Sequence, residues 1–261
     1  MPPRKRPRTY DPTRIRTAIL TQLTHLDTAA RSLTEAGLAR PTRLGDWTVR
    51  ELVAHIGMAV TAVGRALELA EPVKQDATLL DWPFATAANA GAIDGFTRRL
   101  AQEGATDLAA TARTLAEQLD AHPGTRLLQT NVGAMPLAEY LVTRTVELVV
   151  HTDDLNAALP EAEVPYDRQA LAAATRLLAD ALAEKAPGGS TEVRVPPFAV
   201  VQCVQGPRHT RGTPPNVVET DPLTWIRLAT GRMTWGNALE EATLTASGER
   251  ADLTPYLPLM S

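Results

Sequence analysis

The chain has 261 residues, of which 44% are hydrophobic and 21% are charged, a composition typical of globular proteins. It excludes a collagen-like or wholly disordered chain, and the single cysteine, Cys203, excludes an internal disulfide bond and a multi-cysteine metal cluster. The formal net charge of −4 argues against a nucleic-acid-binding surface on the folded part, and no apolar run is long enough to predict insertion into a membrane.

Residues 1–10 form a basic, proline-rich tail that contains no acidic residue. We interpret this tail as a solvated terminus rather than a nucleic-acid tether. It lacks the apolar segment of a secretory signal. Because the chain is also poor in cysteine, we expect a cytoplasmic protein.

Apolar residues recur at three- and four-residue steps in four segments, which predicts four helices: 13–34, 48–67, 86–121 and 136–158. The second helix has a clear start, because Thr48 and Glu51 form a capping box. Three glycines weaken the third helix, which we expect to be interrupted. Four helices of this length with short connections predict a four-helix bundle over residues 11–160.

After Pro160 the pattern changes to that of a smaller α+β domain, 161–261. A helix fits residues 167–186, and valine-rich runs at 192–195 and 198–205 predict strands. A short helix is expected over 221–230, where Asp221 would cap it. The sequence therefore predicts an α+β protein with a helical first part and a smaller mixed second part.

One group of side chains stands out as a candidate metal site. Glu147 and His151 are four residues apart on the fourth helix and project from the same side. That segment is apolar nearly all round, so the carboxylate needs a proton, an ion pair or a metal. If the second and fourth helices are neighbours, His55 can join them, and two histidines with one carboxylate form a common catalytic zinc set.

Two further residues belong to this prediction. Asp154 would accept a hydrogen bond from the ring nitrogen of His151 that is not on the metal, and Arg144 is a local partner of Glu147. The alternative is structural, because such pairs are common on helices and a lone His55 is more often a hydrogen-bonded core residue. The spacing by itself leaves both interpretations open.

Residues 46–55, D-W-T-V-R-E-L-V-A-H, resemble the W-T-V-x-x-L-x-x-H signature of the mycothiol-dependent maleylpyruvate isomerase N-terminal domain, which belongs to the DinB/YfiT-like metal-binding four-helix bundles. The family's R-x-x-E-x-x-x-H-x-x-D-L element is similar to residues 144–155 in order and spacing. The resemblance covers about residues 11–160. It implies that His55, Glu147 and His151 bind zinc or another divalent metal.

The second half resembles bacterial orthologues of sterol carrier protein in residues 221–231, at Trp235 and in residues 246–249. This resemblance implies a five-stranded sheet covered by helices, with a tunnel for an apolar ligand. Trp225 and Trp235 would line that tunnel or belong to an ordinary core, and the sequence leaves both open.

Together the resemblances imply a metal enzyme that uses a small thiol such as mycothiol. The coordinated thiol would ionise and add to a small electrophilic substrate, which gives isomerisation or thiol transfer. Cys203 is not expected to be the nucleophile, because no neighbour in the sequence would lower its pKa. The alternative is a lipid or sterol carrier without enzymatic activity, in which the bundle is structural.

Two observations on arginine residues leave the identity of the substrate undetermined. The family pattern has an arginine between its two motifs, but residues 81–86 supply none, and Arg98 and Arg99 come later. In the second half, the loop with Arg208, His209 and Arg211 would bind a carboxylate or phosphate, or would be a solvated surface loop.

Overall fold

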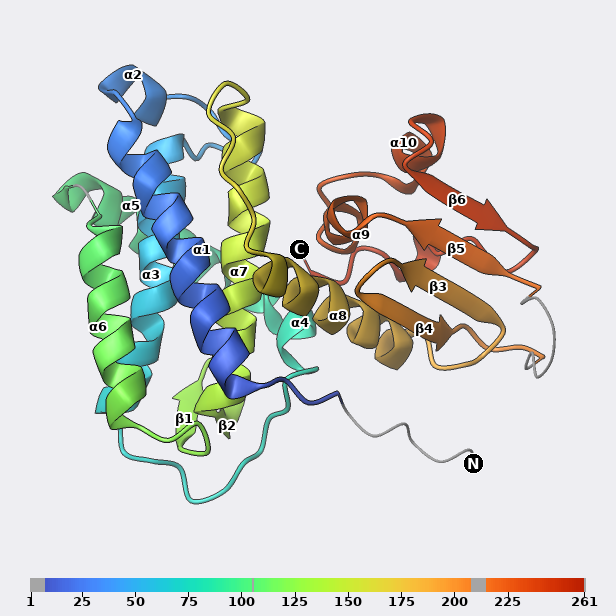
Figure 1. The fold of residues 1–261 in the computed structure, drawn as a ribbon, viewed down its shortest axis with the longest axis horizontal. Helices are drawn as coiled ribbons and strands as arrows, with labels where there is room; N and C mark the ends of the chain where they lie inside the picture. Colours follow the sequence, from blue (N-terminus) through green and yellow to red (C-terminus); the bar gives the residue numbers. More distant parts are fainter. Residues whose placement is uncertain (1–7, 105, 208–214, 261) are drawn as a thin grey trace.

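The computed structural model describes residues 8–104, 106–207 and 215–260 (Figure 1). Its first part is a bundle of four long helices that pack side by side: α1 (Pro12–Ser32), α3 (Val49–Glu68), α6 (Leu108–Ala121) and α7 (Leu137–Ala158). Helix α3 begins at the predicted capping box, in which Glu51 accepts a hydrogen bond from the backbone N–H of Thr48 at 2.9 Å. The predicted four-helix bundle is therefore confirmed.

The predicted third helix is interrupted, as expected. Residues 82–121 divide into α4 (Trp82–Ala85), a short 3₁₀ turn (Ala87–Asn89), α5 (Ala90–Glu103) and α6. Gly104 follows α5 with a φ of +132°, which only glycine adopts readily. Asp107 then caps α6 by accepting from the N–H of Ala110. The break lets α5 pack on α3 separately from α6.

Two short features of the first part were not predicted. Helix α2 (Glu35–Leu38) lies between α1 and α3, and a hairpin of β1 (Leu127–Thr130) and β2 (Gly133–Pro136) connects α6 to α7. Asp76 fastens the hairpin by accepting a hydrogen bond from the N–H of Ala134 at 2.5 Å. This hydrogen bond holds the hairpin against the segment that follows α3, at one end of the bundle.

The second part consists of helices and one sheet: α8 (Arg168–Lys185), β3 (Thr191–Val195), β4 (Ala199–Cys203), β5 (Val217–Thr220), α9 (Pro222–Ala229), α10 (Trp235–Glu240), β6 (Leu244–Ser247) and a 3₁₀ turn (Thr254–Tyr256). The strand order is β4-β3-β5-β6, and only the β3–β5 pair is parallel. Where the structure describes the chain, this sheet has four strands and not the five that the resemblance implied. Strand β5 follows in sequence the loop that was expected to contain Arg208, His209 and Arg211.

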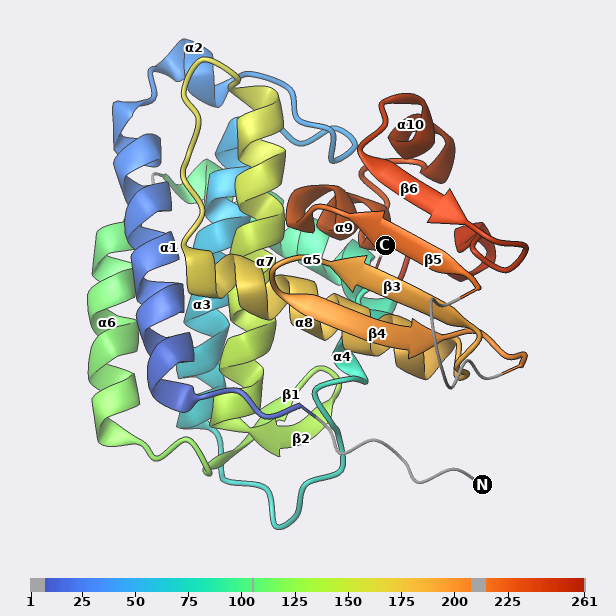
Figure 2. The ribbon, with the colours of Figure 1, turned by 45° about the vertical axis from the view of Figure 1, so that its right-hand side comes forward.

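Helix α8 joins the two parts into one hydrophobic core (Figure 2). It contacts α1 and α7 of the bundle as well as β4 and α9. The inward valines of the sheet and Trp225 of α9 are buried in the same core. Trp225 is therefore a core residue, and Trp235 is partly buried against that core. Lipid carriage, which the sequence left open, gains no support from this packing.

Helix α7 is the central helix of the molecule, because α1, α3 and α8 all pack against it. Its side chains are consequently buried on almost every face, including those of His151, Asp153 and Asp154. Buried ionisable groups must find partners within the protein. Within the described ranges, no helix is both long and apolar enough to span a membrane.

Candidate metal site

The packing of α3 against α7 brings His55, Glu147 and His151 together. The Nε2 atom of His151 lies 3.2 Å from Oε2 of Glu147, and Nε2 of His55 lies 3.9 Å from the same oxygen. One potential ligand atom from each residue lies within 4.8 Å of the other two. The two imidazole rings meet edge to face, with 4.6 Å between their centroids. This group has the donor types and the spacing of a site that could hold one metal ion.

The charges of the three residues follow from burial and hydrogen bonding. Burial lowers the pKa of His55, which leaves this imidazole neutral at pH 7. Burial also opposes the charged form of His151, but hydrogen bonds with Asp154 and Glu147 outweigh it and raise the pKa of His151. For Glu147 the cost of burial is outweighed by hydrogen bonds with both histidines, and its pKa falls well below the usual range. Glu147 is therefore a carboxylate, the form that binds cations.

One buried atom in this group lacks a hydrogen-bond partner. The Nδ1 atom of His55 is buried and makes no hydrogen bond in the part of the chain that the structure describes. The ring nitrogen of His55 that faces Glu147 is Nε2, so a cation shared with Glu147 would not pair Nδ1. The fit to a divalent metal therefore rests on the donor set of two histidines and one carboxylate and on its spacing.

Asp154, the residue that the sequence proposed as a partner of His151, contacts its imidazole ring. Nδ1 of His151 lies 2.9 Å from Oδ2 of Asp154. Interactions with His151 and Arg232 outweigh the cost of burial and lower the pKa of Asp154, so this side chain stays ionised and can accept a hydrogen bond from Nδ1–H of His151. The proton on Nδ1 leaves Nε2 directed at Glu147, which is the arrangement seen when a carboxylate orients a metal-binding histidine.

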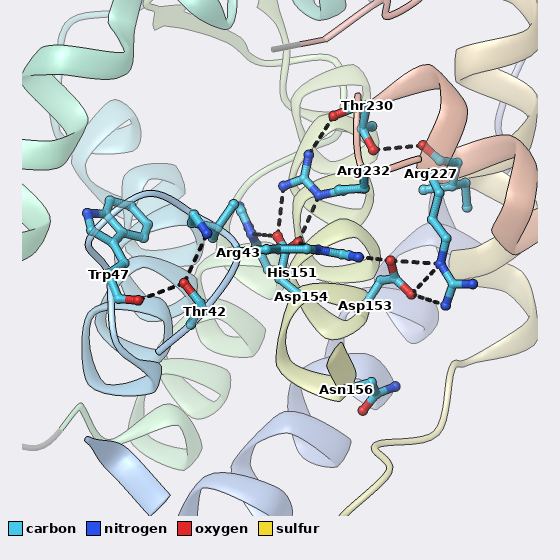
Figure 3. A network of polar contacts seen from close by, with 12 residues as sticks. Thr42, Arg43, Trp47, His151, Asp153, Asp154, Asn156, Arg227, Thr230 and Arg232 are labelled. Carbon is cyan, nitrogen blue, oxygen red and sulfur yellow. Dashed lines mark hydrogen bonds and ion pairs between the residues drawn. The ribbon is translucent and has the colours of Figure 1, made fainter. Parts of the chain in front are cut away.

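Asp153 and Asp154 share a network of arginines that sequence reasoning missed (Figure 3). Arg43, in the loop before α3, donates to both carboxylates. Arg227 of α9 donates to Asp153 at 2.6 Å, and Arg232, which follows α9, donates to Asp154 at 2.7 Å. The network joins three separate parts of the chain. The signal in the sequence for these cationic partners is that both aspartates lie on a helix with apolar residues on almost every face.

This network predicts a loss of stability in acid. Arginine partners outweigh burial and lower the pKa of Asp153, and the pKa of Asp154 is also lowered. Both groups therefore stabilise the fold fully above the pKa of an unfolded aspartate, about 3.9. That contribution is lost as the pH falls below this value toward the folded pKa. Urea unfolding should give a free energy that falls between about pH 5 and 2, and a constant or rising value would contradict the prediction.

A cavity of about 530 Å³ opens beside the three candidate ligands. Aromatic side chains supply much of its lining: Trp47, Trp82, Phe96 and Tyr140. Arg232 and Met260, from the second part of the chain, also face it, so the cavity is completed by both parts. Its size suits a small molecule rather than a macromolecule.

Two arginines of the bundle face the cavity in different ways. Arg144 lies over the ring of Tyr140 at 4.8 Å and over that of Trp82 at 5.6 Å, with Nη2 3.7 Å from Oε1 of Glu147. Arg65 lies 5.4 Å from the ring centroid of Phe96, and within the described residues it has no carboxylate partner. Arg144 thus stabilises Glu147, whereas Arg65 presents an unneutralised charge.

Cys203, Arg98 and Arg99 do not line the cavity. Cys203 is fully buried, and burial raises its pKa to about 12, in keeping with its exclusion as a nucleophile. Arg98 pairs with Asp94 at 3.0 Å, and Arg99 lies over the Phe96 ring. The predicted anion-binding residues Arg208, His209 and Arg211 lie outside the described residues.

Two family models match the chain. The mycothiol maleylpyruvate isomerase N-terminal domain matches residues 19–156, which contain all three candidate ligands, and the bacterial SCP ortholog model matches residues 167–259. The fold is similar to crystal structures of the mycothiol-dependent maleylpyruvate isomerase and of a histidine-to-alanine mutant of it. Each comparison has a TM-score of 0.56 and 16% identity, and covers 93% of this chain and 95% of the other. No curated protein sequence matches the chain.

Proposed function

This chain belongs to the mycothiol maleylpyruvate isomerase N-terminal domain family, and on that premise we propose that it is a metal-dependent enzyme that uses a low-molecular-weight thiol. Mycothiol is the thiol we propose, and the reaction is isomerisation of, or thiol transfer to, a small electrophile. The observation that carries this proposal is the buried group of His55, Glu147 and His151 beside a cavity of about 530 Å³. A thiol cofactor of this kind suits a cytoplasmic location.

We assign the metal to the bundle, residues 11–160, and the closure of the cavity to the sheet domain, residues 161–261. His55, Glu147 and His151 would hold the ion, and their nitrogen and oxygen donors favour zinc, although nickel, cobalt or iron can bind such donors. A bound divalent cation would supply the positive charge that keeps a coordinated thiol ionised.

The residues around the ligands have separate tasks. Asp154 would accept a hydrogen bond from Nδ1 of His151 and so orient Nε2 toward the metal. Hydrogen bonds with the two histidines keep Glu147 ionised, and Arg144, which lies over two aromatic rings, adds to this effect. Aromatic side chains line the cavity in which the thiol and the electrophile would meet.

The position of Arg65 supports a negatively charged electrophile as the substrate. Arg65 lines the cavity and donates to the carbonyl of Met58 at 3.3 Å, and the described residues offer it no carboxylate partner. An arginine in this position can form a charge-assisted hydrogen bond to a carboxylate. We therefore propose a substrate with a carboxylate next to its electrophilic carbon.

Replacing Arg65 with glutamine is expected to raise the KM for maleylpyruvate roughly tenfold with little change in kcat, because the lost contact is present throughout the reaction. Steady-state kinetics at saturating mycothiol measure this. Arg99→Gln is the matched control, since Arg99 contacts the same Phe96 ring but does not line the cavity. Equal KM values for the two variants would remove the assigned role of Arg65.

Metal analysis followed by a thiol titration tests the proposed function. Protein stripped of metal should take up one equivalent of zinc, and the zinc-loaded protein should convert maleylpyruvate only when mycothiol is added. Glutathione in place of mycothiol measures the selectivity for the thiol. Failure to bind zinc, nickel, cobalt or iron at micromolar concentration, or turnover that does not depend on a thiol, would overturn the proposal.

A further inference from the structure

Asp153 is a buried carboxylate that the proposed chemistry does not use. It is neither one of the candidate ligands nor part of the cavity lining, and its side chain is only 1% exposed. Arg227 donates to it through Nη2 at 2.6 Å and through Nε at 3.0 Å, and the hydroxyl of Tyr166 donates at 3.2 Å. Arg43 is a further donor. A carboxylate with so many donors is a fixed anchor point.

The partner of Asp153 in the sheet domain is rigidly connected to Arg232. The backbone carbonyl of Arg227 accepts hydrogen bonds from the N–H of Arg232 at 2.7 Å and of Met233 at 3.2 Å. Nη1 of Arg232 also donates to the carbonyl of Thr230 at 2.9 Å. Residues 227–232 therefore form one compact turn, hereafter the arginine turn, in which the position of Arg227 fixes that of Arg232.

The same turn supports one wall of the cavity. The carbonyl of Ala229 accepts hydrogen bonds from the N–H groups of Leu259 and Met260, at 2.7 and 3.1 Å. Met260 and Arg232 both line the cavity. Displacement of the arginine turn would therefore move this wall and the donor to Asp154 together.

Helix geometry explains how two adjacent aspartates contact different arginines. Successive residues of an α-helix point about 100° apart, so Asp153 and Asp154 of α7 face different partners. Asp154 contacts His151 and Arg232, whereas Asp153 contacts Arg227 (Figure 3). Arg43 bridges the two carboxylates from the bundle side.

We infer that Asp153 is a positioning residue: by anchoring the arginine turn, it sets Arg232 against Asp154 and so fixes the orientation of His151 and the closed cavity wall. This inference rests on the proposed function only in treating His151 as a metal ligand. The anchoring itself is a property of the protein without metal.

Asp153→Asn tests the inference, because it keeps the shape of the side chain and removes its charge. Zinc affinity, measured by competition with a chromophoric chelator, should fall about three- to tenfold, less than for loss of Asp154, because Asp153 acts on His151 only through Arg232 and Asp154. Hydrogen exchange of the amides of residues 227–232 should become faster. Arg227→Gln should reproduce both effects, and the double variant should add little to either, because the two residues act as one unit.

Asp180→Asn is the matched control. It removes another aspartate–arginine pair, with Arg8 at 2.8 Å, which lies away from the cavity. Its zinc affinity and the exchange of residues 227–232 should be those of the wild type. A merely structural role of Asp153 would lower the melting temperature and leave zinc affinity unchanged in the folded protein.

The outcomes separate this inference from the proposed function. Zinc affinity within twofold of the wild type in both folded variants, Asp153→Asn and Arg227→Gln, would overturn the inference and leave the proposed function standing. If the wild type binds no metal, the proposed function fails. The hydrogen-exchange rates of residues 227–232 then test by themselves whether Asp153 anchors the arginine turn. Unchanged exchange at residues 227–232 would then overturn the anchoring. Arg227→Gln keeps the test decisive if Asp153→Asn does not fold.

Discussion

Replacing Glu147 with glutamine is expected to abolish zinc binding and, with it, thiol-dependent turnover. Glu147 is the single carboxylate among the three candidate ligands, and its charge is retained despite burial. Glutamine keeps the size of the side chain but offers a neutral amide. Loss of an indirect partner of a metal ligand already costs 10- to 100-fold in affinity, so loss of this ligand should cost more than about a hundredfold. Chelator competition and metal analysis measure the change.

Glu139→Gln provides the control on the same helix. Glu139 lies in the first turn of α7, and burial raises its pKa, so it is also a carboxyl group in a partly apolar setting. It does not line the cavity. Zinc affinity should be unchanged in this variant. If Glu147→Gln bound zinc as tightly as Glu139→Gln, the assigned metal site would be wrong.

Replacing Asp154 with alanine is expected to destabilise the protein by about 3–5 kcal/mol, the usual cost of breaking a buried ion pair by removing one partner. Asp154 is fully buried, and the change leaves Arg232 and Arg43 without this acceptor. It also frees the ring of His151, so zinc affinity should fall 10- to 100-fold. Urea unfolding and chelator competition measure the two effects.

Asp154→Asn separates the two roles of this side chain. Its amide oxygen can still accept from Nδ1 of His151, so the orientation of the ring should be retained better than in the alanine variant. The arginines nevertheless lose their counter-charge, and the loss of stability should persist in part. A loss below about 1 kcal/mol in Asp154→Ala, the range of exposed ion pairs, would show that the network does not stabilise the fold.

Elements with a clear period or cap could be predicted from the sequence. The long helices of the bundle repeat apolar residues over many turns, and Thr48 with Glu51 gave the start of α3. The hairpin β1–β2 was missed because strands of four residues are too short to establish an alternation. Strand β5, also four residues long, was missed for the same reason.

The candidate site was predictable to the extent that it is local. Glu147, His151 and Asp154 lie within eight residues of one helix, and only the position of His55 required the packing of α3 on α7. Arg43, Arg227 and Arg232 could not be found in this way, because each is 74 to 111 residues from its carboxylate partner in sequence. Arginines on short loops and small helices look like ordinary surface residues until the tertiary fold buries their partners.

The burial of Cys203 has a consequence for a protein that would handle electrophiles. This is the only cysteine in the chain, and its thiol has a pKa raised to about 12. Among the described residues that line the cavity there is no thiol, so an enzyme of the proposed kind would be protected from alkylation of its own cysteine. Maleimides and similar reagents would accordingly report on added cofactor rather than on the native polypeptide.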